Sequence, residues 1–441
     1  MQRFCLKSGF NVPDARGKLR CLNSDRLSRF RVCLMAYLVI GAAVTPVVGG
    51  EQYHKPKIRT ITAFVRIEPA QYRQQIGEAV MMLRQAKAAF EKGGYEVQTI
   101  RMTTQPFTKY IGERSTAEAL VLFESLDELS KKDSFMLNIG PLALADSSDV
   151  AKVELLSQVL ASTRVHASVV VAGDDGVHWN AVRAAAQVVK YVENHSPNGA
   201  NNFDFAAVAM VPPNGPFFPS SNHDGAGRQF SVGWEAGTFV EEVFVGANRD
   251  MQVARELLAK GFEQQAHVVD GIATQVERDS GWKYMGLDPT PVPNTDSSIG
   301  AAIETLTGAK FGSGGTLSSA AVITEAERSI SVRRIGYSGL MLPVLEDPVL
   351  AERWSEGTFD LDSLLAYSAV CGTGLDAIPL PGDVSQQQLE RIIGDMASLA
   401  FKWHKPLTAR LIPAPGKKAG DQTDFDFGIA KFPNTILRPL R

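Results

Sequence analysis

The chain has few cysteines, four in 441 residues, and three of them (Cys5, Cys21 and Cys33) lie within the first 34 residues. Cys371 is the one thiol in the rest of the sequence, so that part can form no internal disulfide and no multi-cysteine iron–sulfur or zinc site. The fold beyond the first 34 residues therefore depends on packing and hydrogen bonds.

A basic excess is also missing from most of the chain. Residues 1 to 34 hold eight of the 45 Lys and Arg but two of the 48 Asp and Glu, so the remainder carries 37 bases against 46 acids. Nucleic-acid binding needs a clustered basic surface that contacts phosphates. This balance argues against nucleic acid as a partner.

Several motifs that would define a chemistry are absent as well. There is no Walker phosphate loop, no GxSxG nucleophile elbow and no HExxH zinc motif. In KFGSGGTL, Leu317 stands where a dinucleotide fingerprint would have its third glycine. The sequence therefore gives no support to P-loop, elbow-type serine hydrolase or zinc peptidase chemistry.

The first 54 residues form a segment distinct from the rest. A basic stretch is followed by a run without charge from Val32 to Gly50 that ends in small residues, which predicts a secretory signal. A marginal membrane anchor, for which Pro46 is unfavourable, and an over-long start with Met35 or a later codon as the true beginning are the alternatives. The protein is then expected to be exported or periplasmic, and otherwise cytoplasmic, with no stable membrane span in the mature chain.

Residues 55 to 441 show the alternation of a single α/β domain. Apolar, β-rich runs such as IRTITAFVRI (58–67) and HASVVVAG (166–173) are separated by stretches with helical periodicity, one ending at Gly93 and Gly94. Strands that read as continuous apolar runs predict a largely parallel sheet covered on both faces.

Five long segments rich in Gly, Pro and Asn interrupt this rhythm in the second half. We expect them to be loops at the carboxyl ends of strands that face one common cavity. They are 211–225, 286–300, 310–320, 371–383 and 412–428.

These loops carry the candidate site residues, except Glu235, which lies between the first two of them. Asn214 could donate to an oxyanion, His223 and Glu235 could act as acid or base, and Cys371 could be a nucleophile, a radical carrier or a small buried side chain. Candidate anion-binding groups are Gly312, Gly314, Gly315, Lys417 and Lys418. Candidate ligands for a divalent cation such as Mg²⁺ or Ca²⁺ are Asp421, Asp424 and Asp426. A tight turn before a helix, for the glycines, and a solvated charged loop, for the Lys and Asp residues, are the alternatives.

Several of these stretches together resemble one family. DSSIGAAIE, FGSGGTL, GYSGLMLPVLEDPVLAERW, YSAVCGTGLDAIPLPGD and KPLTARLIPAPGKKAGDQTDFDF occur in one order and are similar to the signature stretches of the domain-of-unknown-function 711 family, also called uncharacterised protein family 0210. The resemblance begins near Ile58 and implies a ten-stranded α/β barrel like that of pyruvate formate-lyase and ribonucleotide reductase. It implies that AVCGTG, with Cys371, corresponds to the finger loop of those enzymes, and it implies no substrate.

Two classes of function remain open at this point. One is an enzyme acting on a small anionic metabolite in the barrel cavity, and the other is a binding or regulatory protein that uses the same cavity without turnover. Radical chemistry is not expected, because Gly428 lacks the sequence setting of a glycyl radical site and no Glu-x-x-His helical pair indicates a di-iron centre. The sequence leaves a homo-oligomer open.

The predicted signal makes processing testable. We expect the mature protein to lack about the first 49 residues, because signal peptidase cleaves after small residues such as those at 47–49. Intact-mass measurement of the native protein decides this. A mature chain that still begins at Met1 in the cytosolic fraction would contradict it.

Overall fold

The computed structural model describes residues 53–440 apart from 145, 146, 148, 224, 226, 371, 429 and 430. The predicted signal segment up to residue 52 and Cys371 therefore lie outside the described residues. Among the residues that are described, no helix is long and apolar enough to cross a membrane.

Strands and helices alternate through the first half of the chain as predicted. The strands are β1 (Lys57–Val65), β2 (Val97–Thr104), β3 (Met136–Ala143), β4 (His166–Gly173), β5 (Gly176–Val177), β6 (Phe205–Ala209), β7 (Gln229–Glu235), β8 (Lys283–Val292), β9 (Gly374–Pro381) and β10 (Leu407–Ala414). The α-helices are α1 (Tyr72–Lys92), α2 (Thr116–Asp133), α3 (Val150–Ser162), α4 (Trp179–His195), α5 (Gly237–Gly246), α6 (Met251–Ser280), α7 (Ile299–Thr307), α8 (Thr316–Ser329), α9 (Pro348–Glu356), α10 (Leu361–Val370) and α11 (Gln386–Trp403). Two 3₁₀ segments are η1 (Phe107–Lys109) and η2 (Pro197–Asp204).

Local sequence signals fix several helix ends. Ser115 before α2 and Ser385 before α11 form capping boxes with the residue three positions later. Asp347 caps α9, and Pro348 occupies its first position, where a missing N–H costs nothing. Gly281 ends α6 in the left-handed conformation that glycine adopts without strain.

The described strands form one ten-stranded sheet with the order β8-β7-β1-β2-β3-β4-β6-β10-β9, and β5 pairs only with β4. Strands β1, β2, β3, β4 and β6 are parallel neighbours. β7 is antiparallel to β1 and β10 is antiparallel to β6, and each continues into a parallel partner, β8 or β9. The predicted α/β class with ten strands is confirmed.

A segment without regular structure links the two edge strands. This bridging segment, residues 333–345, follows α8. At its start Leu287 N of β8 donates to Arg333 O at 3.0 Å, and Ile335 N donates to Leu287 O at 3.0 Å. At its end Val344 N and Leu345 N donate to carbonyls of β9 at 3.1 and 3.2 Å. Among the described residues β8 and β9 do not pair with each other, so the bridging segment connects the edges of the curved sheet.

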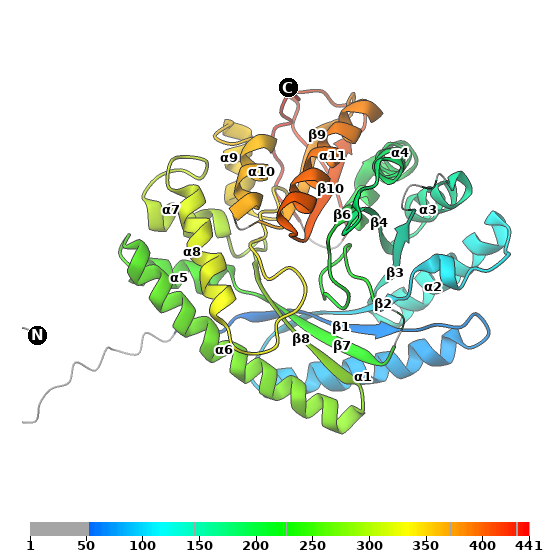
Figure 1. Ribbon diagram of the computed structural model, residues 1–441, viewed down its shortest axis with the longest axis horizontal. Coiled ribbons are helices and arrows are strands. Elements are labelled where there is room, and N and C mark those ends of the chain that lie inside the picture. Colours follow the sequence, from blue (N-terminus) through cyan, green and yellow to red (C-terminus); the bar gives the residue numbers. More distant parts are fainter. Residues whose placement is uncertain are drawn as a thin grey trace, which may run out of the picture. The chain divides into compact units, whose positions relative to one another are not determined.

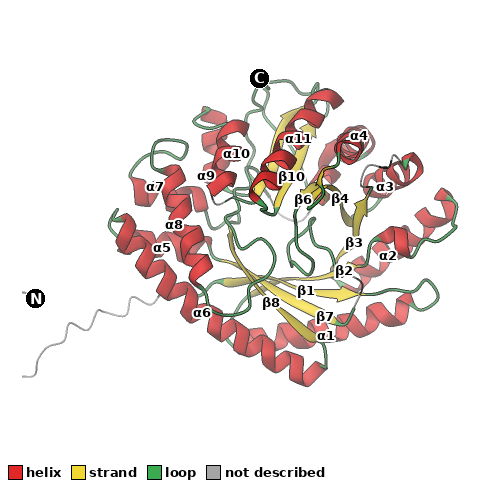
Figure 2. Cartoon of the chain, in the orientation of Figure 1, coloured by secondary structure: helices red, strands yellow, loops and turns green. Residues whose placement is uncertain are grey.

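The helices lie outside this sheet, and loops occupy its inner side (Figure 1, Figure 2). Ile61, Ala63 and Val65 of β1 belong to the main apolar core, which includes Val80 and Leu83 of α1. The sheet was expected to be covered on both faces, and helices cover its outer face while loops cover its inner face (Figure 1, Figure 2). There, Thr62, Thr103 and Asn138 are buried polar residues that hold a loop.

The loop that they hold is residues 211–225, here called the inner loop. Thr62 Oγ1 of β1 donates to Pro216 O at 2.8 Å, and Asn138 Nδ2 of β3 donates to Pro219 O at 2.8 Å. The hydroxyls of Thr103 in β2 and Ser221 lie 2.7 Å apart. Three adjacent strands thus fix the inner loop against the sheet, because buried polar groups of both partners must be hydrogen-bonded.

Asp288 of β8 fixes the bridging segment in a similar way. Its buried carboxylate accepts from Tyr337 N at 2.8 Å, Ser338 N at 3.2 Å and both donors of Thr290, at 3.1 Å from the amide and 2.6 Å from the hydroxyl. Gly336 has a φ of +71°, and a Cβ at this position would lie 2.0 Å from Asp288 Oδ2. Glycine is therefore required for this close approach.

The Asp288 contacts predict a large stability effect. Asp288→Ala leaves buried N–H and O–H donors without an acceptor, so we expect it to lower the free energy of unfolding by about 3 kcal/mol or more. Urea unfolding measures this. The exposed Asp279 serves as the control, and Asp279→Ala should change stability by less than about 0.5 kcal/mol. Equal unfolding midpoints for the two variants would contradict this role of Asp288.

Candidate functional site

A cavity of about 620 Å³ lies on the inner side of the sheet, between the strands, the inner loop and the bridging segment. From the parallel strands it is lined by Arg59 and His166, near the starts of β1 and β4, and by Arg101 in the middle of β2. The lining residues used below are Arg59, Gln98, Thr99, Arg101, His166, Phe203, Phe217, Phe218, Ser220, Val292, Asn294, Tyr337, Met341, Glu346, Thr373, Asp376, Arg410 and Phe432. Groups at or beyond the carboxyl ends of strands also line the cavity: Val292 ends β8, and the inner loop follows β6.

Three of the five segments expected at one cavity reach it. Segment 211–225 contributes Phe217 to Ser220, segment 286–300 contributes Val292 and Asn294, and segment 371–383 contributes Thr373 and Asp376. Segments 310–320 and 412–428 contribute no lining residue. Parts of 286–300 and 371–383 are also strands, β8 and β9, and not loops.

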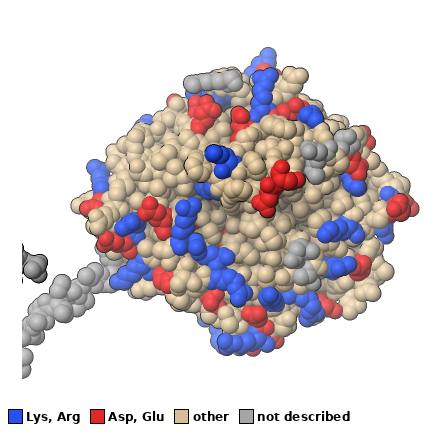
Figure 3. Space-filling model, in the orientation of Figure 1, with Lys and Arg blue, Asp and Glu red and all other residues tan. Residues whose placement is uncertain are grey.

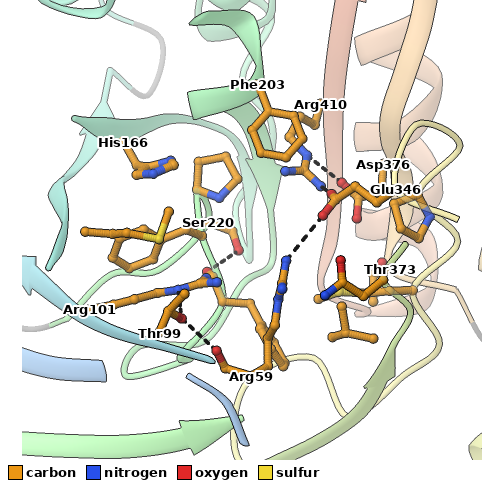
Figure 4. Close-up of a pocket in the computed structure, with 18 of the residues that line it drawn as sticks. Arg59, Thr99, Arg101, His166, Phe203, Ser220, Glu346, Thr373, Asp376 and Arg410 are labelled. Atoms are coloured by element: carbon orange, nitrogen blue, oxygen red, sulfur yellow. Dashed lines mark hydrogen bonds and ion pairs between the residues drawn. The ribbon is translucent and has the colours of Figure 1, made fainter. Parts of the chain in front are cut away.

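Four charged side chains form a chain of ion pairs along one wall (Figure 4). Arg410 Nε of β10 donates to Asp376 Oδ1 of β9 at 2.7 Å, and its Nη2 donates to Glu346 Oε1. Arg59 Nη2 of β1 reaches the other oxygen of Glu346 at 3.5 Å. Burial alone would lower the pKa of Arg410, but the two carboxylates outweigh it and raise that pKa. Paired in this way, two guanidinium groups and two carboxylates balance each other.

Arg101 of β2 differs from these two arginines because no acidic side chain among the described residues pairs with it. Its Nε donates to Thr99 Oγ1 at 3.1 Å, and its guanidinium lies 5.1 Å from the centre of the Phe218 ring. The residue is 5% exposed. Burial, and then the charge of Arg59, lowers the pKa of Arg101 to about 9, so the group still carries its charge at neutral pH. A buried charge without a counterion is costly, and an anion in the cavity would compensate it.

His166 of β4 lines the same cavity and has an acid behind it. Its Nδ1 lies 3.5 Å from Asp204 Oδ1, and Arg164 Nε donates to Asp204 Oδ2 at 2.8 Å. Burial, followed by the charge of Arg101, lowers the pKa of His166 well below its usual value. Burial raises the pKa of Asp204 to about 6, against the opposing effect of Arg164. The imidazole is therefore neutral, and its Nδ1 lies near the Asp204 carboxylate without a hydrogen-bond partner among the described atoms.

Glu235, predicted as an acid or base, lies behind the cavity wall. Its carboxylate accepts hydrogen bonds from Gln98, from Asn294 at 3.3 Å and from Ser297 at 3.2 Å. Gln98 and Asn294 themselves line the cavity. Burial raises the pKa of Glu235.

The two predicted residues of the inner loop, His223 and Asn214, do not line the cavity. His223 Nε2 lies 3.1 Å from Val65 O, and its Nδ1 accepts from Gly225 N at 2.9 Å. Asn214 is buried at a φ of +65°, and its Oδ1 has no hydrogen-bond partner among the described atoms. Cys371 lies outside the described residues, so its predicted role stays a prediction.

The predicted anion and metal loops lie away from the cavity. Gly312 N donates to Thr316 Oγ1 at 3.0 Å, and Gly315 precedes α8 directly. Lys417 Nζ donates to Gln422 O at 2.8 Å and lies 3.0 Å from Asp424. Lys418 N, Asp421 and Asp426 make contacts within the loop. In the described part of the chain, no three His, Cys, Asp or Glu side chains form a group that could hold a metal ion.

The residues with the most distinctive geometry were missed from the sequence. Arg59, Arg101 and Arg410 each stand inside an apolar β-rich run, in KIRTITAFV, VQTIRMTT and LTARLIPA. A charged residue in a strand that is predicted to be buried must be paired or must face a cavity. This conflict between a charged side chain and a strand predicted to be buried is the sequence signal that could have identified the three arginines.

The fold and this cavity define an α/β protein with a charged internal pocket. Residues 52–426 match the family model described as "Uncharacterised ACR (DUF711)". The chain belongs to this family, which confirms the resemblance seen in the sequence.

Relatives and one solved structure are similar to the chain. A UPF0210 protein of Pyrobaculum islandicum is 30% identical, with 83% of this chain and 87% of the relative covered. One from Methanocaldococcus jannaschii is 25% identical over 82% and 84% of the two chains. The anaerobic ribonucleotide reductase of Thermotoga maritima matches 80% of each chain with a TM-score of 0.39 and 7% identity, which is too low to support an inference about function.

The different pairing of the two buried arginines predicts opposite stability effects. Arg410→Met leaves Glu346 and Asp376 without their shared partner, so we expect a loss of about 3–5 kcal/mol in the free energy of unfolding. Arg101→Met removes an uncompensated charge, and without ligand we expect a gain of about 1 kcal/mol or more. Chemical denaturation of both variants tests this. A loss of stability in Arg101→Met similar to that in Arg410→Met would contradict the unpaired state of Arg101.

Proposed function

We propose that the protein is an enzyme that acts on a small organic anion held in the inner cavity by Arg101. The observation that carries the proposal is the buried guanidinium of Arg101, which has no acidic partner among the described residues. A protein that keeps such a charge loses stability, and a bound anion restores the balance. Thr99 and Ser220 also line the cavity, but their hydroxyls donate to Arg59 O and Phe217 O, so the anion contact is assigned to Arg101.

His166 supports catalysis over binding alone. It lines the cavity together with Arg101, and its neutral imidazole has Asp204 at 3.5 Å. Asp204 can stabilise the imidazolium that forms when His166 takes a proton from the bound anion. Buried ionisable groups with shifted pKa values cluster at active sites, and Arg101 and His166 are two such groups in this cavity. The alternative is a binding or regulatory protein that holds the same anion without converting it.

The roles predicted from the sequence for Cys371, His223, Lys417, Lys418, Asn214, the glycines 312, 314 and 315, and the cation ligands stay predictions. Their contacts favour roles in holding loops, except for Cys371, which the structure does not describe. The expectation that the chemistry is not radical-based also stays a prediction.

Ligand binding and turnover can be separated in one experiment. We expect thermal-shift measurements with a panel of carboxylates and phosphates to find an anion that raises the free energy of unfolding, by about 2.7 kcal/mol at a concentration of 100 times Kd. Arg101→Met should weaken that binding at least about tenfold, because a hydrogen-bonded charge is lost. The exposed Arg278, in the last turn of α6, provides the control variant Arg278→Met.

The same ligand is then followed for product formation. Conversion by the wild type, and its loss in His166→Gln with affinity retained, is the result expected for an enzyme. A ligand that is bound through Arg101 but never converted would favour the binding protein. Stabilisation that is unchanged in Arg101→Met would contradict the proposed site.

A further inference from the structure

The charges that line the cavity determine what kind of anion fits. Arg59, Arg101 and Arg410 are opposed by the carboxylates of Glu346 and Asp376. Glu96 also lines the cavity, but its side chain is 62% exposed and pairs with Lys57 at 3.7 Å. With His166 neutral, the buried wall carries one net positive charge.

One net charge is neutralised by a monoanion. A phosphate monoester carries close to two negative charges at neutral pH. Such a ligand would leave a negative excess in a buried cavity, next to Glu346 and Asp376. Because buried charges interact strongly and are poorly screened, this excess would be unfavourable. A carboxylate matches the wall.

A second part of the cavity wall is apolar. Phe217, Val292, Tyr337 and Met341 form a small cluster separate from the main core, and all four line the cavity. Phe203, Phe218 and Phe432 add further aromatic lining. About 620 Å³ is far more space than an inorganic ion or acetate occupies, and it falls within the range for sites that enclose organic ligands.

From these two walls we infer that the ligand is a monocarboxylate with an apolar or aromatic body. The carboxylate contacts Arg101, and the body packs against the cluster of Phe217, Val292, Tyr337 and Met341. This inference rests on the proposed function, since it assigns a ligand class to the same site.

Isothermal titration of the full chain with four probes tests the inference. The probes are 3-phenylpropanoate, acetate, succinate and inorganic phosphate. We expect 3-phenylpropanoate to bind at least about tenfold more tightly than acetate, because its ring buries apolar surface. Succinate and phosphate should both bind more weakly than 3-phenylpropanoate. Succinate brings a second negative charge, and phosphate lacks the apolar body.

A near-isosteric change in the apolar wall gives a second readout. Met341→Gln keeps the shape of the side chain and makes it polar, so affinity for 3-phenylpropanoate should fall about five- to tenfold while that for acetate changes less than about twofold. Met341→Leu, which stays apolar, should retain the affinity of the wild type within about threefold.

The outcomes separate the inference from the proposed function. If all four anions bind with similar affinity and all depend on Arg101, the proposed site stands and the ligand class is overturned. Tighter binding of succinate or phosphate would overturn it as well. If no anion binds, the proposed function fails and the inference fails with it.

Discussion

The cost of burying charge on the inner face of the sheet governs this structure. Arg59 and Arg410 are placed inside the fold, and each lies against a carboxylate that comes from a distant part of the chain. Glu346 directly follows the bridging segment, and Asp376 is in β9. Because an unpaired buried charge is so unfavourable, these ion pairs require the bridging segment and the β9–β10 edge to hold one arrangement. Arg101 is the exception, and that exception defines the site.

Other buried polar residues on the inner face also have partners, but these partners are neutral hydrogen-bonding groups. Thr62, Thr103 and Asn138 on three parallel strands accommodate the inner loop, and Asp288 accommodates the bridging segment. Both segments then form walls of the cavity, one with Phe217 and the other with Met341. The polar inner face thus positions the apolar half of the site. Acidic and basic groups both occur on the face of the molecule that Figure 3 shows.

The sequence predicted the first half of the fold well, because strands such as β1 and β4 and helices such as α1 and α4 show clear periodicity. It failed for β8 and β9, whose Gly and Pro residues are typical of loops. The structure explains this failure. Both are edge strands of the sheet. A proline has no N–H to donate, and an edge strand tolerates this because the sheet has no neighbouring strand on one side.

The candidate site was harder to predict for a different reason. Arg59, Arg101 and Arg410 meet across more than three hundred residues of chain, so no local spacing records their proximity. The inner loop and the segments 286–300 and 371–383 were correctly expected at the cavity. The loop at 412–428 was expected there because of its charge, and in the structure Lys417 and Asp424 pair with each other instead. A charged residue can form its ion pair within its own loop, and composition alone does not reveal which residues do so.

The most direct test of the account is to locate an anion beside Arg101. Crystals soaked in bromide should show an anomalous peak in contact with the Arg101 guanidinium, and crystals of Arg101→Met should lack it, because the buried charge attracts a monoanion. The account would be contradicted if the wild-type crystals showed no bromide at this position and the Arg101 guanidinium formed an ion pair with a carboxylate of the chain.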